Sequence, residues 1–274
     1  MKRTRFAVFF AALVSMLSFT SCLDSDGGSN TSSVSAILRV NGFAGSYWFT
    51  DMVGNKYTPS NQSALASSGL DSYQFAYIMG TFDAGQLDAS TSTKKEVIVD
   101  LYGASPVKAF GVATDDGSEA DEFANAPMYA AGQDVGSNTD LQFFSRNQMF
   151  VPVSYFYKSS SSNDDLKKEL NSHEFYLFYD KEKSEMGTLS FKLRHRVQDP
   201  TVNKDRTTLG SEYLYFNIAQ AMAAYKNEFG SEPANIRIEY QYNYSNGEMT
   251  EYTSTKEVTT DFQQWLKWFE QLEK

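Results

Sequence analysis

The sequence of 274 residues has little of what metal-binding, disulfide-bonded and nucleic-acid-binding proteins use. It has one cysteine and two histidines, so it cannot form an internal disulfide or a cysteine-rich zinc site. Its 24 Lys+Arg are outnumbered by 34 Asp+Glu, which gives a net charge of −10. Such a chain lacks the basic face that neutralising phosphates requires. We therefore expect no nucleic-acid partner, no metal site and no cofactor.

Motifs of common hydrolases and metalloenzymes are also missing. The sequence contains no Gly-x-Ser-x-Gly elbow and no His-Glu-x-x-His zinc motif. Its densest polar cluster spans residues 194–200, where Asp199 could polarise His195, although a strand that ends in a turn explains the cluster better. We expect no enzyme. The catalytic alternative is a hydrolase with a cryptic site near His195, because geometry and not sequence order defines a Ser-His-Asp triad.

The N-terminus carries a processing signal. Residues 1–5 hold three positive charges, and residues 6–17 form an apolar run broken only by Ser15. This run is shorter than the roughly 20 residues that span a bilayer, and it has the layout of a signal peptide. The only cysteine, Cys22, follows behind the small residue Ser21. Residues 19–22 resemble the lipobox of bacterial lipoproteins, with Phe19 where leucine is commonest.

The lipobox resemblance implies removal of residues 1–21 and lipidation of the Cys22 sulfur. The alternative is an ordinary signal peptide followed by a free thiol, which would be unusual in an oxidising envelope. Residues 23–33 contain no aromatic residue and only one apolar side chain, so residues 22–34 predict a flexible tether. Asp24 and Asp26 resemble the acidic export signal of surface lipoproteins, although any solvated tether carries some acid. We expect a lipid-anchored protein of the outer membrane or cell surface of a Gram-negative bacterium.

The rest of the chain predicts an all-β, mainly β protein. Aromatic residues make up 15 % of the sequence, which argues against a disordered chain. Short alternating runs in residues 35–114 predict a small β barrel or sandwich, with Pro106 separating its last two strands. Residues 128–259 predict a β-sandwich with one helix near residues 217–229. The acidic residues 115–127 predict a solvated linker, because their spacing does not match a calcium loop.

The last quarter of the chain holds the candidate binding residues. Tyr240, Tyr242 and Tyr244 alternate with polar residues and are the best candidates for an exposed platform that stacks on a ligand, although most aromatic residues are expected in the core. Asn246-Gly247 predicts a tight hairpin directly after them. Residues 260–274 predict an amphipathic helix, which either packs on its own sandwich or binds a partner.

This organisation resembles the NigD-like lipoproteins of Bacteroides and its relatives. The resemblance rests on the lipobox ending at Cys22 and on residues 48–59, 174–179, 193–199 and 213–218. It implies an N-terminal OB-like barrel, a C-terminal β-sandwich, and a role in bacteriocin immunity or at the cell surface. We therefore expect a non-catalytic envelope lipoprotein that binds an unknown protein or glycan partner. A structural accessory subunit of an outer-membrane complex, using the C-terminal helix, is the second alternative.

Overall fold

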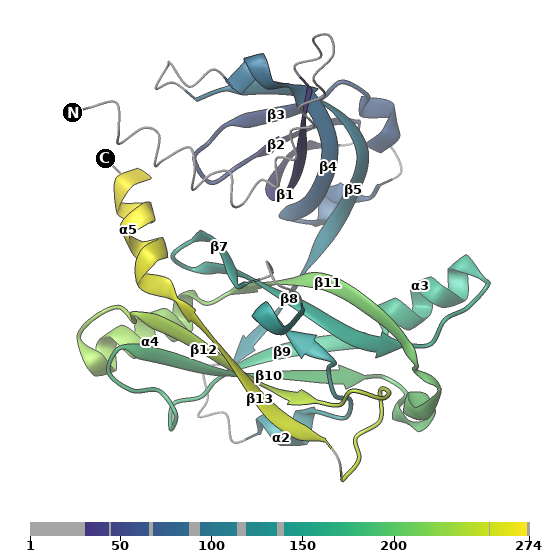
Figure 1. Cartoon of the computed structure of the whole chain (residues 1–274), viewed down its shortest axis with the longest axis vertical. Coiled ribbons are helices and arrows are strands. Elements are labelled where there is room, and N and C mark those ends of the chain that lie inside the picture. Colours follow the sequence, from purple (N-terminus) through teal and green to yellow (C-terminus); the bar gives the residue numbers. More distant parts are fainter. Residues whose placement is uncertain are drawn as a thin grey trace, which may run out of the picture. The chain divides into compact units, whose positions relative to one another are not determined.

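The structure, a computed structural model, describes most of the chain after the predicted signal peptide. The described residues are 31–43, 45–65, 68–87, 94–113, 119–135, 140–251 and 253–272. Cys22 and the predicted signal peptide lie outside them. The chain forms two compact units, which divide between Lys108 and Ala109. Both are mostly β (Figure 1), which confirms the predicted fold class.

Five strands of the first unit pair in a closed order. They are β1 (Thr31–Phe43), β2 (Ser46–Thr50), β3 (Lys56–Pro59), β4 (Phe75–Asp83) and β5 (Glu96–Ala113). Strand β1 pairs with β2 and β4, β2 pairs with β3, β3 runs parallel to β5, and β5 returns to β4. This five-strand ring is the pairing expected for an OB-like barrel. Its inward side chains, Val34, Leu38, Phe49, Tyr57 and Val97 among them, form one buried cluster.

Two boundaries of the first unit differ from the sequence-based expectation. Residues 31–34, predicted as the end of the tether, already belong to β1, where Val34 is buried. The prediction that Pro106 separates two strands is wrong, because β5 runs through it and Pro106 stands opposite Ala76 of β4. Proline removes one N–H donor, but its φ is compatible with an extended strand.

The second unit contains two sheets, which β5 joins by pairing with both β9 and β11. Residues from 109 on in β5 pair with β9, and the order continues through β10 and β12 to β13. In the other sheet, β8 pairs with β11, β6 and β7. The strands are β6 (Ala130–Ala131), β7 (Gln142–Ser145), β8 (Gln148–Tyr157), β9 (His173–Tyr179), β10 (Thr188–Val197), β11 (Thr208–Asn217), β12 (Asn235–Tyr242) and β13 (Ser254–Asp261). The ring of Tyr155 on β8 contacts Phe175 on β9 at 5.3 Å, so the sheets pack through aromatic side chains.

The α-helices described in the second unit are α2 (Ala120–Phe123), α3 (Asn163–Asn171), α4 (Ala219–Phe229) and α5 (Phe262–Leu272). Short 3-10 helices lie in the first unit at Gln62–Leu65, Leu70–Ser72 and Ala84–Leu87 and in the second at Gly132–Val135 and Pro200–Asp205. Helix α4 ends at Gly230, whose φ of 74° is the left-handed conformation that favours glycine at a helix end. The predicted C-terminal helix is α5, and it follows β13 directly (Figure 1).

Helix α5 packs through its apolar face. Phe262 and Phe269 are buried, and Phe262 and Trp265 lie 4.8 and 5.3 Å from the ring of Phe143 on β7. The Asp261 carboxylate accepts hydrogen bonds from the backbone N–H groups of Gln263 and Gln264. An acidic cap of this kind satisfies donors that the first helical turn leaves unpaired.

The described part of the acidic segment, residues 119–127, packs on the second unit and does not form a solvated linker. Ala120 and Ala126 are buried. Asp121 accepts a 2.8 Å hydrogen bond from Arg194 Nε, and Ala126 forms a bridge with His195. The acidic composition predicted a solvated segment, but the Asp121 carboxylate pairs with the buried Arg194 and so attaches this segment to the sheet.

The predicted tight hairpin at Asn246-Gly247 is wrong. Strand β13 starts at Ser254, which stands opposite Tyr242, so a longer connection joins the two strands. Gly247 does not have the positive φ of a type I′ turn. Its N–H donates to the carbonyl of Arg206, and the side chain of Asn246 accepts from the N–H of Glu248. Contacts within this loop and to Arg206 therefore set its path.

Among the described residues, no helix is long and apolar enough to cross a membrane. The same residues contain no group of three or more His, Cys, Asp or Glu side chains arranged to hold a metal ion.

Candidate functional site

The end of β12 carries a surface formed by three tyrosines, Tyr129, Tyr242 and Tyr244, which we call the tyrosine strip. Backbone hydrogen bonds hold it together: Met128 N–H donates to the Gln241 carbonyl, and Asn243 N–H donates to the Met128 carbonyl. The segment before β6 is therefore attached alongside β12. This attachment places Tyr129 next to a tyrosine that is far from it in the sequence.

The rings of the tyrosine strip are close to one another and reach solvent. The Tyr242 ring lies 6.4 Å from Tyr129 and 6.5 Å from Tyr244. Tyr244 is 68 % exposed and Tyr129 is 38 % exposed. The ammonium nitrogen of Lys256 lies 3.8 Å from the Tyr242 ring centroid, within the range of a cation–π interaction. Rings with an apolar face and a polar hydroxyl are well suited to a surface that is covered only when a partner binds.

The structure separates the three tyrosines that the sequence grouped. Tyr240 is fully buried, because β12 there lies between Leu193 of β10 and Lys256 of β13 and both faces of the strand are covered. It cannot belong to an exposed platform. Tyr242 and Tyr244 lie beyond the covered region. The sequence did not indicate Tyr129, because its neighbour Met128 pairs with Tyr242 across more than a hundred residues.

His173 and His195 form a buried pair and not an accessible catalytic site. His195 is 1 % exposed, and its ring stacks on Phe175 at 4.5 Å with an interplanar angle of 7°. His195 Nε2 lies 2.8 Å from His173 Nδ1, and His195 Nδ1 lies 3.2 Å from the Pro127 carbonyl. Asp199 instead accepts from the N–H of Thr201 and caps the following 3-10 helix. Both nitrogens of His195 are thus engaged within the protein.

The hydrogen bonds assign the protons of the pair. A carbonyl oxygen only accepts, so His195 Nδ1 carries a proton and its Nε2 accepts from His173 Nδ1. His173 Nε2 faces Glu169 Oε1 at 3.3 Å, and Arg206 Nε donates to the same oxygen at 2.7 Å. An ionised carboxylate only accepts. His173 is therefore an imidazolium held between Glu169 and a neutral His195.

Electrostatics agree with this assignment. Burial lowers the pKa of His195 well below its usual value, and the charge on His173 lowers it further. Burial raises the pKa of Glu169, but hydrogen bonds from Arg206 and from the backbone N–H of Lys158 outweigh it and leave this pKa below its usual value. The arrangement stabilises one charge state of the core and offers no free base to a substrate.

The buried, neutral His195 makes a contribution to stability that acid removes. The unfolded chain takes up a proton on this histidine near pH 6.5, whereas the folded protein does not, so the contribution of His195 to the free energy of unfolding falls as the pH drops below about 6.5. The His195→Gln variant keeps an amide donor and a carbonyl acceptor at this position. Between pH 6.5 and 5.5, we expect the free energy of unfolding of this variant to fall by about 1 kcal/mol less than that of the wild type. Urea unfolding followed by tryptophan fluorescence measures this difference. Equal losses in both proteins would contradict the assignment.

Comparisons with solved structures find similarity to proteins from Bacteroides. It is similar to a candidate lipoprotein from Bacteroides fragilis, with 26 % identity and a TM-score of 0.69 over 84 % of this chain and 98 % of that one. It also matches a NigD-like immunity protein from Bacteroides caccae, with 13 % identity and a TM-score of 0.44 over 82 % of this chain and 91 % of that one. The predicted resemblance to NigD-like lipoproteins is confirmed as a likeness, and the weaker match carries no further argument.

Neither a scan against protein-family models nor a search of curated proteins finds a match. The similarity to the Bacteroides fragilis protein is consistent with a non-catalytic protein of the cell envelope.

Proposed function

We propose that this protein is a lipid-anchored, non-catalytic protein of the outer membrane or cell surface that binds a protein or glycan partner. The observation that carries the binding role is the tyrosine strip. Three neighbouring rings are partly exposed at one strand end. Tyrosine rings that only stabilise the core would be buried. The anchoring role is supported by Cys22 behind its lipobox-like sequence and by the fold shared with a candidate lipoprotein.

Tyrosine rings suit either class of partner. A sugar ring stacks on an aromatic face while its hydroxyl groups bond to neighbouring polar atoms, and a protein interface uses tyrosine as a large amphipathic anchor with few rotatable bonds. Lys256 adds a positive charge beside Tyr242 on a protein whose net charge is negative. The strip therefore has a positive charge beside one of its rings.

The two alternatives fit the structure less well. The burial of His195 and the use of both its nitrogens leave this histidine inaccessible as a base for a hydrolase. Helix α5 buries Phe262 and Phe269 within the protein, so an accessory subunit that docks through this helix would have to use its remaining side chains, of which Leu266 and Trp268 are half-buried.

The binding role is tested by capture of envelope components on immobilised protein. We expect Tyr242→Ala and Tyr244→Ala each to reduce the specifically retained component by about five- to tenfold, because truncating an aromatic anchor commonly costs more than 1 kcal/mol. Tyr102→Ala is the matched control, since Tyr102 is 67 % exposed in the first unit while Tyr244 is 68 % exposed. Equal retention by all three variants would exclude the strip as the binding surface.

A further inference from the structure

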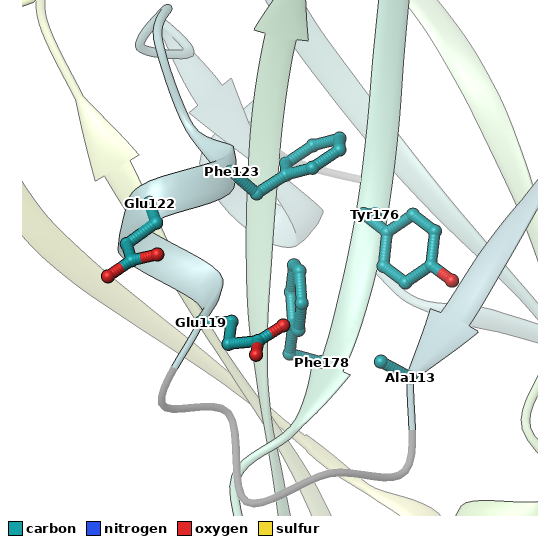
Figure 2. Close-up of a pocket in the computed structure, with 6 residues that line it drawn as sticks. All are labelled: Ala113, Glu119, Glu122, Phe123, Tyr176 and Phe178. Atoms are coloured by element: carbon teal, nitrogen blue, oxygen red, sulfur yellow. The ribbon is translucent and has the colours of Figure 1, made fainter.

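A second surface feature of the second unit is a small hollow between α2 and β9. Its volume is about 360 Å³, at the small end of the range for ligand sites. It is lined by Ala113, Glu119, Glu122, Phe123, Tyr176 and Phe178 (Figure 2). The hollow therefore has room for one side chain or a similarly small group. It uses none of the residues of the tyrosine strip.

Three aromatic rings form the wall of the hollow. Phe123 lies 5.5 Å from Tyr176 and 5.9 Å from Phe178, and Tyr176 lies 5.0 Å from Phe178. The rings are tilted to one another and come from two elements, α2 and β9. They present aromatic faces around a common space, which is the arrangement that attracts an organic cation.

Gly111 determines where the Tyr176 ring lies. A Cβ on Gly111 would stand 2.3 Å from Tyr176 Cε2 and 2.7 Å from Tyr176 Cζ, far closer than atoms can approach. The ring therefore rests directly against the backbone of β5. A glycine at this position of the strand is what allows the aromatic wall to form.

The rim of the hollow is acidic. Glu119 and Glu122 are both exposed, and Figure 2 shows the Glu119 carboxylate beside Phe178, whereas Glu122 points away from the three rings. Glu119 thus offers a hydrogen-bond acceptor next to the aromatic wall. Glu122 adds negative charge to the rim but points away from the rings.

The same short helix already binds two guanidinium groups of this chain. Arg194 Nε donates to Asp121 at 2.8 Å, and Arg196 Cζ lies 5.7 Å from the centroid of the Phe123 ring. One carboxylate and one aromatic ring of α2 therefore each accept a guanidinium group of this chain. The hollow brings both kinds of acceptor together at the surface, because its three rings lie beside Glu119.

We propose that the hollow binds the guanidinium group of an arginine side chain presented by a partner peptide or protein. A planar guanidinium stacks on a ring while its N–H donors reach Glu119, which a compact and strongly hydrated lysine ammonium does less well. This site goes beyond the partner-binding role of the tyrosine strip, because it names a separate surface and the chemical group that the surface recognises.

The test uses the full mature chain and three blocked tripeptides, Gly-Arg-Gly, Gly-Lys-Gly and Gly-citrulline-Gly, titrated while backbone amide NMR signals are recorded. We expect the arginine peptide to shift the signals of Phe123, Tyr176 and Phe178 in a saturable manner. We expect the citrulline peptide, which has the same shape without the charge, to leave them unchanged. The proposal is overturned if citrulline or lysine binds as tightly as arginine, or if the arginine peptide shifts other regions only.

Substitution of the two rim glutamates tests which carboxylate binds the guanidinium group. We expect Glu119→Gln to weaken binding of the arginine peptide about two- to fivefold, the range for an exposed ion pair, and Glu122→Gln to weaken it less. Both side chains are exposed, so neither change is expected to disturb the fold, and Tyr244→Ala is the control for the tyrosine strip. If Glu119→Gln has no effect, or if Tyr244→Ala abolishes the shifts, the assignment to this hollow is wrong.

Discussion

Replacing Cys22 by serine is expected to abolish acylation of the protein and to remove it from the outer-membrane fraction. Cys22 is the only cysteine in the chain, so no other sulfur can accept a thioether-linked lipid. Several acyl chains on one residue provide stable membrane attachment, whereas a single chain binds only marginally. Feeding cells a labelled fatty acid and fractionating their membranes measures both effects.

Ser21→Ala is the matched control for this experiment. Alanine keeps the small side chain before the cysteine that a lipobox requires, and we expect this variant to be labelled and membrane-bound like the wild type. Fatty-acid label on the Cys22→Ser protein would contradict the lipoprotein interpretation. Loss of label from both variants would show that the residue before the cysteine is more restricted than the resemblance implies.

Replacing Arg194 by leucine is expected to lower the free energy of unfolding by about 3–5 kcal/mol, the usual cost of removing one partner of a buried ion pair. Arg194 is 1 % exposed, and its Nη2 donates to Glu239 Oε1 at 2.6 Å while its Nε donates to Asp121. Burial raises the pKa of Glu239, but hydrogen bonds from Lys183 and Arg194 outweigh it and keep this pKa below its usual value. Removing the arginine leaves this largely buried carboxylate with less compensation.

The control is Arg196→Leu, two residues further along the same strand. Arg196 is exposed, and the side-chain interaction described for it is with the ring of Phe123. We therefore expect its replacement to change the free energy of unfolding by about 1 kcal/mol or less. Chemical unfolding of both variants measures the difference. Equal stabilities would show that the Arg194 cluster contributes little. An Arg194→Leu protein that fails to fold while Arg196→Leu folds normally would agree with the larger cost.

Sequence patterns predicted the strands because each buries alternate side chains over a short distance. Leu189, Phe191 and Leu193 alternate along β10 and are buried, and the strand pairs with β9. The helix ending at Gly230 was predicted for the same local reason, since a glycine in the left-handed conformation is a signal contained in a few residues.

Features that depend on distant contacts were not predictable in this way. Asn246-Gly247 satisfies the local rule for a tight hairpin, but contacts to Arg206 draw the loop along another path. Tyr240 follows the same alternation as Tyr244, yet only the former lies where neighbouring strands cover β12. No single-sequence pattern reports which stretch of a strand a distant element will cover.

The candidate sites also combine residues that local sequence predicts with residues that only distant contacts bring together. Tyr242 and Tyr244 were expected from alternation within one strand, whereas Tyr129 joins them through pairing over more than a hundred residues. The hollow combines α2, whose acidic composition predicted a solvated linker, with β9, whose aromatic residues were expected in the core. Asp121 explains the discrepancy: its pairing with Arg194 attaches the acidic segment to the sheet, and this contact is visible only in three dimensions.

Site-specific photo-crosslinking in intact cells tests the central claim most directly, namely that the tyrosine strip contacts a partner in the envelope. A photoreactive phenylalanine analogue is placed at Tyr244 and, as a control of equal exposure, at Tyr102. We predict a discrete, light-dependent adduct at Tyr244 that weakens when Tyr242 is changed to alanine, and none at Tyr102. Adducts of equal strength at both positions, or none at Tyr244, would contradict the proposed binding surface.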